Sequence, residues 1–162
     1  MEKVQIIIKN YGTVEVELDA TQAPITVENF LSLVDNHFYD GLTFHRIIDG
    51  FMIQGGDPLG NGTGGSPNKI KGEFSANGVN NSISHVRGVI SMARSQMMDS
   101  ASSQFFIVHE DSKFLDGQYA GFGHVTSGME IVDAICKSTK VEDSNGTVRK
   151  ENQPIIEKIV RV

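Results

Sequence analysis

Apolar residues occupy every second position in two short stretches near the start of the chain, residues 4–8 and residues 14–18. An alternation with a period of two places one side of an extended chain against a core and the other side toward solvent. The polar turn Asn10-Tyr11-Gly12 separates the two stretches. This pattern predicts a β-hairpin at the beginning of the chain.

Two later stretches have apolar residues at the spacing of a helix. The first begins at Pro24 and places apolar residues at Val27, Phe30, Leu31 and Val34. Proline is well tolerated in a first helical turn, because the N–H that it lacks would be unpaired there. The second stretch has apolar residues at Met129, Val132, Ile135 and Cys136. Each stretch predicts an amphipathic helix, and we interpret Cys136 as a packed core thiol rather than a nucleophile.

Short β-rich runs, separated by Gly, Asn and Ser, make up most of the remaining chain. They cover residues 43–48, 51–54, 88–93, 104–108 and 120–125, and residues 155–162 form a closing strand that we expect to pair with the first strand. Many short strands favour a barrel or a sandwich. No internal repeat or long linker divides the chain, so residues 1–162 are predicted to form a single domain.

The composition narrows the possible partners and compartments. The 162 residues are 39% hydrophobic and 21% charged, as in typical globular proteins, and the formal charge of −6 argues against nucleic acid as a partner. A single cysteine excludes an internal disulfide, and no apolar stretch approaches the roughly 18 residues that span a bilayer. The N-terminal residues do not read as an export signal. We therefore expect a cytoplasmic protein with no membrane partner.

Several familiar catalytic and cofactor patterns are missing or out of context. The glycines of residues 60–65 match a dinucleotide-binding pattern, but no helical pattern follows them, which favours a mobile surface loop. The five histidines are dispersed, so we expect no metal site. Ser102, Ser103 and His109 could lie close together, but without a Gly-x-Ser-x-Gly turn a serine-rich loop is favoured over a hydrolase site.

One segment combines a cation with an apolar face. In strand alternation, Arg46 points to the same face as Phe44 and Ile48. Gln54 and Gln104 likewise stand among large apolar residues. Two interpretations remain open at this point. Either these residues build a binding cleft, or Arg46 pairs with a carboxylate and the aromatic residues fill a core.

The segment around Arg46 also resembles a family signature. Residues 44–57, which read Phe-His-Arg-Ile-Ile-x-Gly-Phe-Met-Ile-Gln-Gly-Gly-Asp, closely resemble the signature of the cyclophilins, a family of peptidyl-prolyl cis-trans isomerases. Further blocks look like family landmarks in the family's order, at residues 11–12, 24–30, 88–93, 103–107, 115–117 and 122–125. The resemblance covers nearly the whole chain.

This resemblance implies a mainly β protein, a closed eight-stranded antiparallel β-barrel capped by two α-helices, with an active cleft on its outer surface. By similarity, Arg46 is the essential cation, and the catalytic set is Arg46, Phe51 and Gln54. The proline pocket is implied to consist of Phe51, Met52, Phe106 and Leu115. Gln54 and Gln104 are implied to contact the substrate backbone, and main-chain hydrogen bonds to the residues before proline are implied for Ala93 and Arg94.

Two positions depart from the best-known eukaryotic cyclophilins. The usual tryptophan beside the pocket is Phe114, and the usual histidine after Leu-Asp-Gly-x is Tyr119. Both residues are expected to bind substrate. Bacterial cytosolic members often have these substitutions, and residues 94–101 also resemble the bacterial form of their loop. We expect the departures to weaken binding of the inhibitor cyclosporin more than catalysis.

The implied function is peptidyl-prolyl cis-trans isomerisation, which assists protein folding by rotation about X-Pro bonds. The implied substrates are proline-containing peptides and unfolded or flexible protein segments. Rotation about an amide breaks no σ bond, so no cofactor or metal is expected. We expect a monomer. The alternative is a proline-peptide binding module or chaperone whose turnover is incidental, and the intact Arg46 argues against a purely binding role.

Overall fold

The computed structural model describes residues 1–162, and the chain begins with the predicted hairpin. Strands β1 (Glu2–Ile8) and β2 (Gly12–Leu18) pair in antiparallel fashion, with Val4 opposite Val16. Their apolar positions are buried, and the residues between them are half-buried or exposed. Asn10 has a φ of 70° and Gly12 a φ of 127°. These positive values are what a tight turn between two strands requires, and they explain the polar, glycine-containing interruption.

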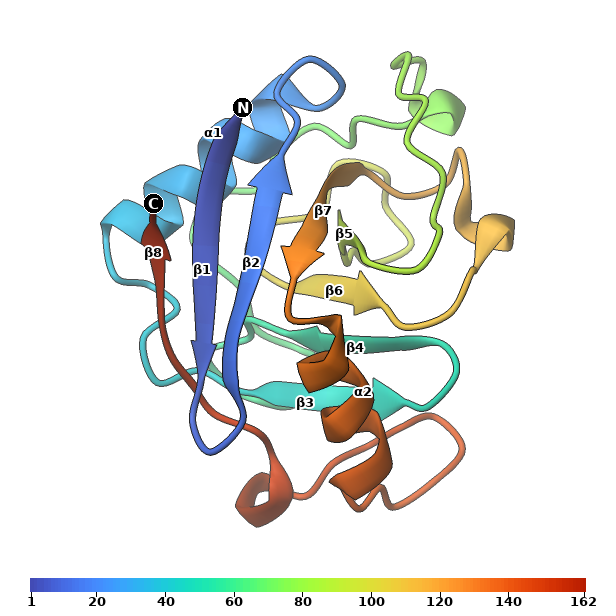
Figure 1. The fold of residues 1–162 in the computed structure, drawn as a ribbon. Coiled ribbons are helices and arrows are strands. Elements are labelled where there is room, and N and C mark those ends of the chain that lie inside the picture. The colour runs from blue at the N-terminus through green and yellow to red at the C-terminus, as the bar shows by residue number, and fades with distance from the viewer.

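All eight strands form one antiparallel sheet in the order β3-β4-β6-β5-β7-β2-β1-β8 (Figure 1). The remaining strands are β3 (Phe44–Ile48), β4 (Met52–Gly55), β5 (Val89–Met92), β6 (Phe105–Val108), β7 (Gly121–Ser127) and β8 (Ile156–Arg161). β8 pairs with β1, which confirms that the first and last strands are neighbours.

The curled sheet closes through a few hydrogen bonds rather than a full ladder. The edge strands are β3 and β8. The N–H of Phe44 donates to the carbonyl oxygen of Pro154 (3.0 Å), and the N–H of Ile156 donates to that of Leu42 (2.7 Å). The predicted eight-stranded antiparallel barrel is therefore present, and these short contacts join its two edges.

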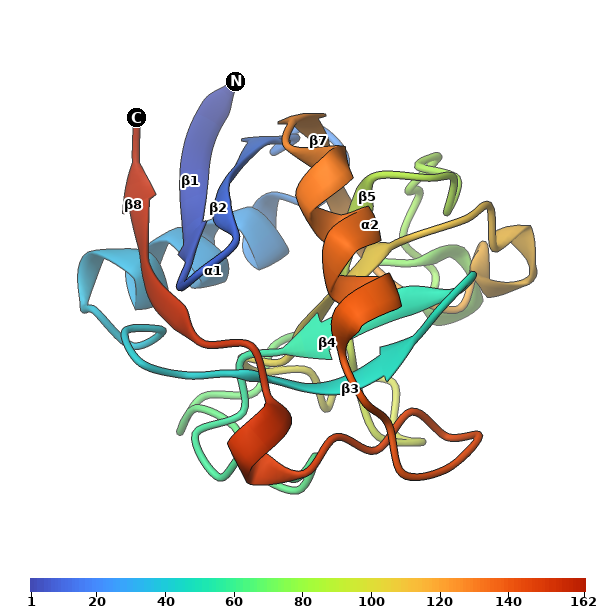
Figure 2. The same ribbon diagram turned by 60° about the horizontal axis from the view of Figure 1, so that its bottom comes forward.

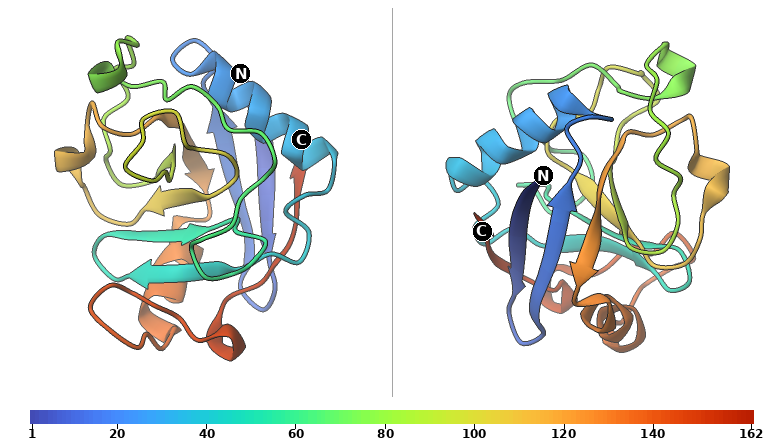
Figure 3. Two further views of the ribbon diagram at one scale, coloured as in Figure 1. Left: turned by 180° about the vertical axis from the view of Figure 1, so that it is seen from behind. Right: turned by 45° about the horizontal axis from the view of Figure 1, so that its top comes forward.

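The two predicted helices lie at opposite ends of the curled sheet (Figures 2 and 3). Helix α1 (Pro24–Asp35) buries Thr26, Val27, Phe30, Leu31 and Val34, and helix α2 (Met129–Ser138) buries Val132, Ile135 and Cys136. The carboxylate of Glu73 accepts the N–H groups of Ile25 (3.2 Å) and Thr26 (2.6 Å), so a distant residue caps the first turn of α1. No helix is long and apolar enough to cross a membrane.

Three short 3₁₀ helices lie in the connections, η1 (Ser75–Asn77), η2 (Lys113–Leu115) and η3 (Lys150–Asn152). The main core fills the interior of the curled sheet and includes the aromatic rings of Phe30 and Phe105, which meet edge to face at 5.7 Å. Cys136 belongs to this core, as predicted. A second, smaller core cluster consists of Met52, Val89, Phe106, Val108 and Leu115. Strands β5 and β6 are buried at every position, because both of their faces are covered.

An irregularity in β3 changes the direction of one side chain. The register of β3 against β4 shifts between Phe44 and Arg46, so β3 has one residue more than its partner there. Phe44 therefore joins Ile47 in the main core, whereas Ile48 packs against the smaller cluster outside it. The prediction that Arg46 shares a face with Phe44 is wrong, because the bulge interrupts the alternation. Arg46 faces the smaller cluster, as Ile48 does.

Candidate active site

Arg46 reaches from β3 to neighbours that carry no charge. Its Nε donates to the main-chain oxygen of Asn145 (2.8 Å), and its Nη2 donates to the Oδ1 of the same residue (3.2 Å). Its Nη1 donates to the Oε1 of Gln54 (3.2 Å). No carboxylate forms an ion pair with the guanidinium. The interpretation of Arg46 as part of an ion pair is therefore wrong. Since a guanidinium has five N–H donors, Arg46 also keeps free donors.

Asn145 belongs to a turn between α2 and η3 that docks on β3. The N–H of Ile47 donates to the carbonyl oxygen of Gly146 (2.9 Å), and the Asp143 carboxylate accepts the N–H of Thr147 (3.1 Å). Gly146 has a φ of 81°, and a Cβ there would lie 2.5 Å from the oxygen of Ile47. This position accordingly requires glycine. The Asn-Gly pair in the sequence indicates a turn, but nothing in it shows that the turn touches Arg46.

A chain of amide groups continues from Arg46 across the sheet. The Nε2 of Gln54 donates to the Oε1 of Gln104 (3.0 Å), and the Nε2 of Gln104 donates to the carbonyl oxygen of Gly64 (2.8 Å). The bond from Gln104 to Gly64 directs the oxygen of Gln104 at Gln54. The bond from Gln54 to Gln104 in turn directs the oxygen of Gln54 at the guanidinium. Gln104 therefore orients Gln54 from behind.

The loop that contains Gly64 wraps around one buried carboxylate. Asp57 accepts the N–H groups of Leu59 (2.8 Å), Asn61 (3.2 Å) and Gly62 (2.6 Å). Burial alone would raise the pKa of Asp57, but these backbone donors lower it below its ordinary value. No helix follows in residues 66–74, so the glycine pattern lacks the structure that a dinucleotide-binding loop requires.

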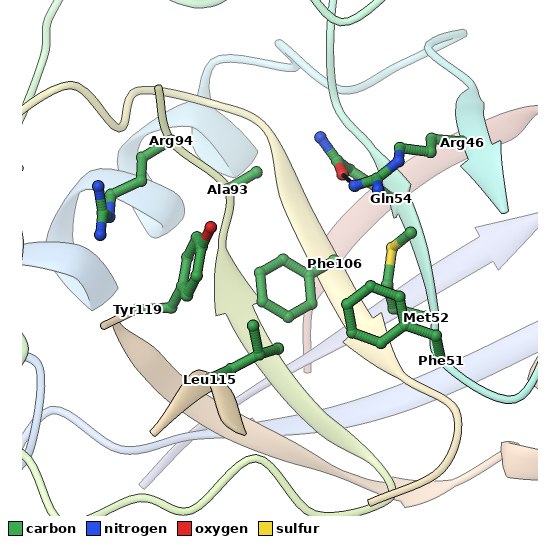
Figure 4. A pocket seen from close by; sticks show the side chains of 9 residues that line it. All are labelled: Arg46, Phe51, Met52, Gln54, Ala93, Arg94, Phe106, Leu115 and Tyr119. Atoms are coloured by element: carbon green, nitrogen blue, oxygen red, sulfur yellow. Dashed lines mark hydrogen bonds between the residues drawn. The ribbon is translucent and has the colours of Figure 1, made fainter. Parts of the chain in front are cut away.

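An apolar cleft adjoins the guanidinium of Arg46 on the outer side of the sheet. Figure 4 shows the ring of Phe106 between those of Tyr119 and Phe51, with the amide of Gln54 beside the guanidinium. The residues that line the cleft are Arg46, Phe51, Met52, Gln54, Ala93, Arg94, Phe106, Leu115 and Tyr119. The smaller core cluster contributes its floor, because Met52, Phe106 and Leu115 belong to both. The cleft is thus a rigid apolar surface with one charged wall.

Phe106 is supported from behind by a histidine that the sequence analysis did not single out. The ring of His85 stacks on Phe106, with centroids 6.0 Å apart and planes 20° apart. The Nε2 of His85 lies 2.8 Å from the Oγ of Ser91, and its Nδ1 lies 3.0 Å from a carboxylate oxygen of Asp116. Burial lowers the pKa of His85, although Asp116 opposes this shift. His85 therefore holds Phe106 in place without entering the cleft.

The side chain of Arg94 is engaged elsewhere. Its guanidinium lies 4.7 Å from the ring centre of Phe74 and 4.9 Å from that of Tyr119, and its Nη2 donates to the oxygen of Gln118 (2.7 Å). It points away from Phe106 in Figure 4. The N–H of Ala93 donates to the oxygen of Gln104 (3.0 Å). The C=O of Ala93 and the N–H of Arg94 have no internal partner, and these main-chain groups are open to a ligand.

Nearly all residues predicted for the site lie together. Of the two that do not line the cleft, Gln104 lies behind Gln54, and Phe114 lies at the rim with its ring 5.5 Å from that of Phe51. Phe114 is 73% exposed. The weaker hydrolase interpretation has no support, because the hydroxyl of Ser103 donates to Gly56 and His109 contacts Asp133.

Comparison with known proteins identifies the family of this chain. The family model described as cyclophilin type peptidyl-prolyl cis-trans isomerase/CLD matches residues 3–160. Peptidyl-prolyl cis-trans isomerase B of Bacillus subtilis is 43% identical over 151 residues, which cover 93% of this chain and 96% of the relative. A Helicobacter pylori peptidyl-prolyl cis-trans isomerase is 42% identical, and the match covers 82% of this chain and 80% of the relative.

A solved structure shows the same architecture. The crystal structure of a Cryptosporidium parvum cyclophilin type peptidyl-prolyl cis-trans isomerase, determined in the presence of the dipeptide Ala-Pro, superposes with a TM-score of 0.85. It is 33% identical in sequence, and the match covers 98% of this chain and 97% of that structure. The curled antiparallel sheet is therefore the fold of a cyclophilin type peptidyl-prolyl cis-trans isomerase. The chain belongs to the cyclophilin-type peptidyl-prolyl cis-trans isomerase family.

Proposed function

We propose that the proline ring of a substrate packs on Phe51, Met52, Phe106 and Leu115, while a free N–H of Arg46 donates to the prolyl nitrogen. One observation supports this assignment: the guanidinium of Arg46 faces an apolar cleft and donates only to neutral partners. A cation without a counter-ion beside an apolar surface costs stability, so its presence indicates a use. Isomerisation of an X-Pro bond provides that use.

The reaction needs a donor at the nitrogen and little else. The barrier to rotation is about 18–20 kcal/mol, because twisting the C–N bond breaks amide resonance. The twisted amide has a pyramidal, more basic nitrogen than either planar form. A donor aimed at that nitrogen therefore stabilises the transition state more than the ground states, which is the condition for catalysis. No proton is transferred and no bond is cleaved.

Arg46 does not account for the whole rate enhancement. A hydrogen bond from a charged donor contributes about 1.5–3 kcal/mol, or roughly ten- to hundred-fold in rate. Raising the spontaneous rate to about a thousand per second takes on the order of 6 kcal/mol. The remainder is assigned to the apolar pocket, which holds the ring fixed and excludes water from the more dipolar planar amide.

The rest of the peptide is proposed to lie along the polar side of the cleft. The C=O of Ala93 and the N–H of Arg94 would pair with the residues before proline, in the manner of an added strand. Gln54 would contact the substrate backbone near Arg46, and Gln104 would contact it from the neighbouring pocket beside Ala93 and Arg94. Because the cleft lies on the outer surface, the proposed substrates are proline-containing peptides and unfolded or flexible protein segments.

Exchange NMR on a short Ala-Pro peptide tests this proposal against the alternative of a pure binding module. An isomerase increases the cis-trans exchange rate at catalytic concentrations of protein, whereas a binding module shifts resonances only in proportion to the complex formed. Arg149→Ala is a suitable control variant, because Arg149 is an exposed arginine that pairs with Glu142 and Glu151 and does not line the cleft. Binding without accelerated exchange would contradict the proposal.

The cytoplasmic location and the monomeric state stay predictions. Fractionation of cells tests the first, and light scattering on the purified protein tests the second. Residues 1–162 are likewise proposed to fold as one domain.

A further inference from the structure

Three potential metal ligands from distant parts of the chain meet beside α2. Asp49 lies in the turn between β3 and β4, His109 follows β6, and Cys136 is in α2. Each residue offers one ligand atom, and these atoms all lie within 4.8 Å of one another. Figures 1 and 2 show how α2 passes beside the β3-β4 hairpin, which brings the three together.

The hydrogen bonds of His109 leave its Nδ1, which lies in this cluster, without a proton. The N–H of Gly50 donates to the Nδ1 of His109 (2.8 Å), so Nδ1 carries no proton. The Nε2 lies 2.8 Å from a carboxylate oxygen of Asp133 and donates its proton there. Asp133 is held in turn by Arg87 at 2.7 Å and 2.8 Å. A histidine whose second nitrogen donates to an anchored carboxylate is the usual arrangement of a metal ligand.

The other two ligand atoms have no hydrogen-bonding partner. The Oδ1 of Asp49 lies 3.4 Å from Nδ1 of His109, whose single lone pair accepts the N–H of Gly50, so no hydrogen bond joins these two atoms. Asp49 makes no hydrogen bond within the protein, and its side chain is 63% exposed. The thiol of Cys136 is 94% buried, since only 6% of the residue is exposed, and it also makes no hydrogen bond. A cation between the three atoms would give Asp49 and Cys136 a partner and would replace the N–H of Gly50 as the partner of Nδ1.

We propose that Asp49, His109 and Cys136 bind a soft divalent cation, with Zn²⁺ as the natural occupant. Thiolate, imidazole and carboxylate are the ligands zinc takes in proteins, and three protein ligands leave the fourth position to water. On binding, the thiol of Cys136 loses its proton to solvent and the S–Zn bond forms, while Nδ1 of His109 exchanges the N–H of Gly50 for the metal. A surface cleft lined by Asp49, Cys136 and Thr139 provides the entry path.

The proposed role of the metal is structural. It would tie α2 to the turn that precedes Phe51, and it lies outside the proline cleft. A ligand that binds only the folded state stabilises it by mass action. At a free Zn²⁺ concentration of 100 times the dissociation constant, we expect the melting temperature to rise by about 5–10 °C.

Titration of the chelator-treated protein with Co²⁺ tests the site, because a cobalt-thiolate bond gives a charge-transfer band in the near ultraviolet. With a phosphine reductant present, the band is expected to saturate at one equivalent, and Zn²⁺ is expected to displace it. Isomerase activity on the same samples is expected to be unchanged by chelator or metal, so this result is independent of the proposed function.

Variants separate the cluster from adventitious binding. Asp49→Asn changes an exposed side chain, and it is expected to leave the fold intact and weaken Co²⁺ binding at least ten-fold. His109→Gln should also weaken Co²⁺ binding at least ten-fold, and Cys136→Ser should abolish the band. His124→Gln, which removes an exposed histidine elsewhere, should change nothing. Absence of the band at one equivalent, or equal affinities of the parent protein and Asp49→Asn, would overturn the proposal.

Discussion

Two arginines, Arg46 and Arg87, are held in opposite ways. Arg87 donates to both carboxylate oxygens of Asp133, at 2.8 Å and 2.7 Å, and to Glu110 at 3.3 Å. This pairing raises the pKa of Arg87 and lowers that of Asp133 to about 2. Arg46 donates only to the carbonyl and amide oxygens of Asn145 and Gln54.

The difference bears on the proposed role of Arg46 as a cation that is free to bind a substrate. Neutral acceptors fix the plane of a guanidinium but leave its charge uncompensated. A carboxylate that accepts two hydrogen bonds from the guanidinium fixes the plane and also compensates the charge. The same residue type is thus a structural tie at position 87 and a candidate catalytic group at position 46.

The largest expected effect on activity comes from replacing each of the two arginines by alanine in turn. Arg46→Ala is expected to lower kcat/KM at least ten-fold, and up to about a hundred-fold, with a melting temperature near that of the parent. Arg46→Lys should also lose much of the activity, because an ammonium lacks the planar set of donors. Arg87→Ala should leave kcat/KM unchanged and lower the melting temperature by about 2–4 °C, as expected for a partly exposed ion pair. Similar activity losses in both alanine variants would end the distinction.

Phe114, at the rim of the cleft, has no hydrogen-bond donor in its side chain, whereas Arg46 and Arg87 each have several. An inhibitor carbonyl buried there without a partner costs about 1–3 kcal/mol, so we expect cyclosporin to bind weakly and Phe114→Trp to improve inhibition roughly ten-fold. Turnover of proline peptides should not change. Inhibition constants of both proteins in one isomerase assay provide the measurement, and equal constants would assign drug sensitivity to Tyr119 or to the loop at residues 95–101.

Substitutions of Asn145 change the acceptor that the guanidinium of Arg46 contacts, and one of them gives Arg46 a carboxylate partner like that of Arg87. Asn145→Ala removes one neutral acceptor and is expected to lower kcat/KM about two- to five-fold, mainly through kcat. Asn145→Asp places a carboxylate on the guanidinium and should lower kcat/KM further, although the hydrogen bond is kept. Asn152→Ala, in the exposed turn η3, is the matched control. An aspartate variant as active as the parent would show that the free charge of Arg46 is unimportant.

The smallest effects are expected from pH. Arginine stays charged, so kcat/KM should be flat between about pH 6 and pH 9. Stability behaves differently, because burial lowers the pKa values of His45 and His85 below the ordinary 6.5. The unfolded chain then binds more protons, and the melting temperature should fall by a few degrees as pH decreases through about 6.5 toward 5. Thermal melts and assays across this range check both statements, and a bell-shaped activity profile would reveal a missed proton transfer.

Periodicity in the sequence was sufficient for the hairpin and both helices, and the expected pairing of the first and last strands is confirmed. The residues of the cleft were predictable from the family resemblance, because four of them fall in the signature segment at residues 44–57 and three more in the further family blocks. The direction of the Phe44 side chain was not predictable, because the bulge depends on the register in which β3 pairs with β4.

Contacts between distant loops were equally out of reach. Asn145 and His85 have ordinary local surroundings in the sequence, and their roles follow from the docking of one loop on β3 and the stacking of one ring on Phe106. The cluster of Asp49, His109 and Cys136 could not be recognised from spacing, because each ligand comes from a different element.

The position of the cleft on the outer wall determines how a polypeptide can reach it. The interior of the curled sheet is filled with side chains, so nothing has to be threaded through it. A proline in the middle of a long chain, or in an exposed loop of a folded protein, can dock sideways without a free end and leave in the same way. Whether a proline of a substrate chain can bind to such a surface depends on its local accessibility and not on its distance from a chain terminus.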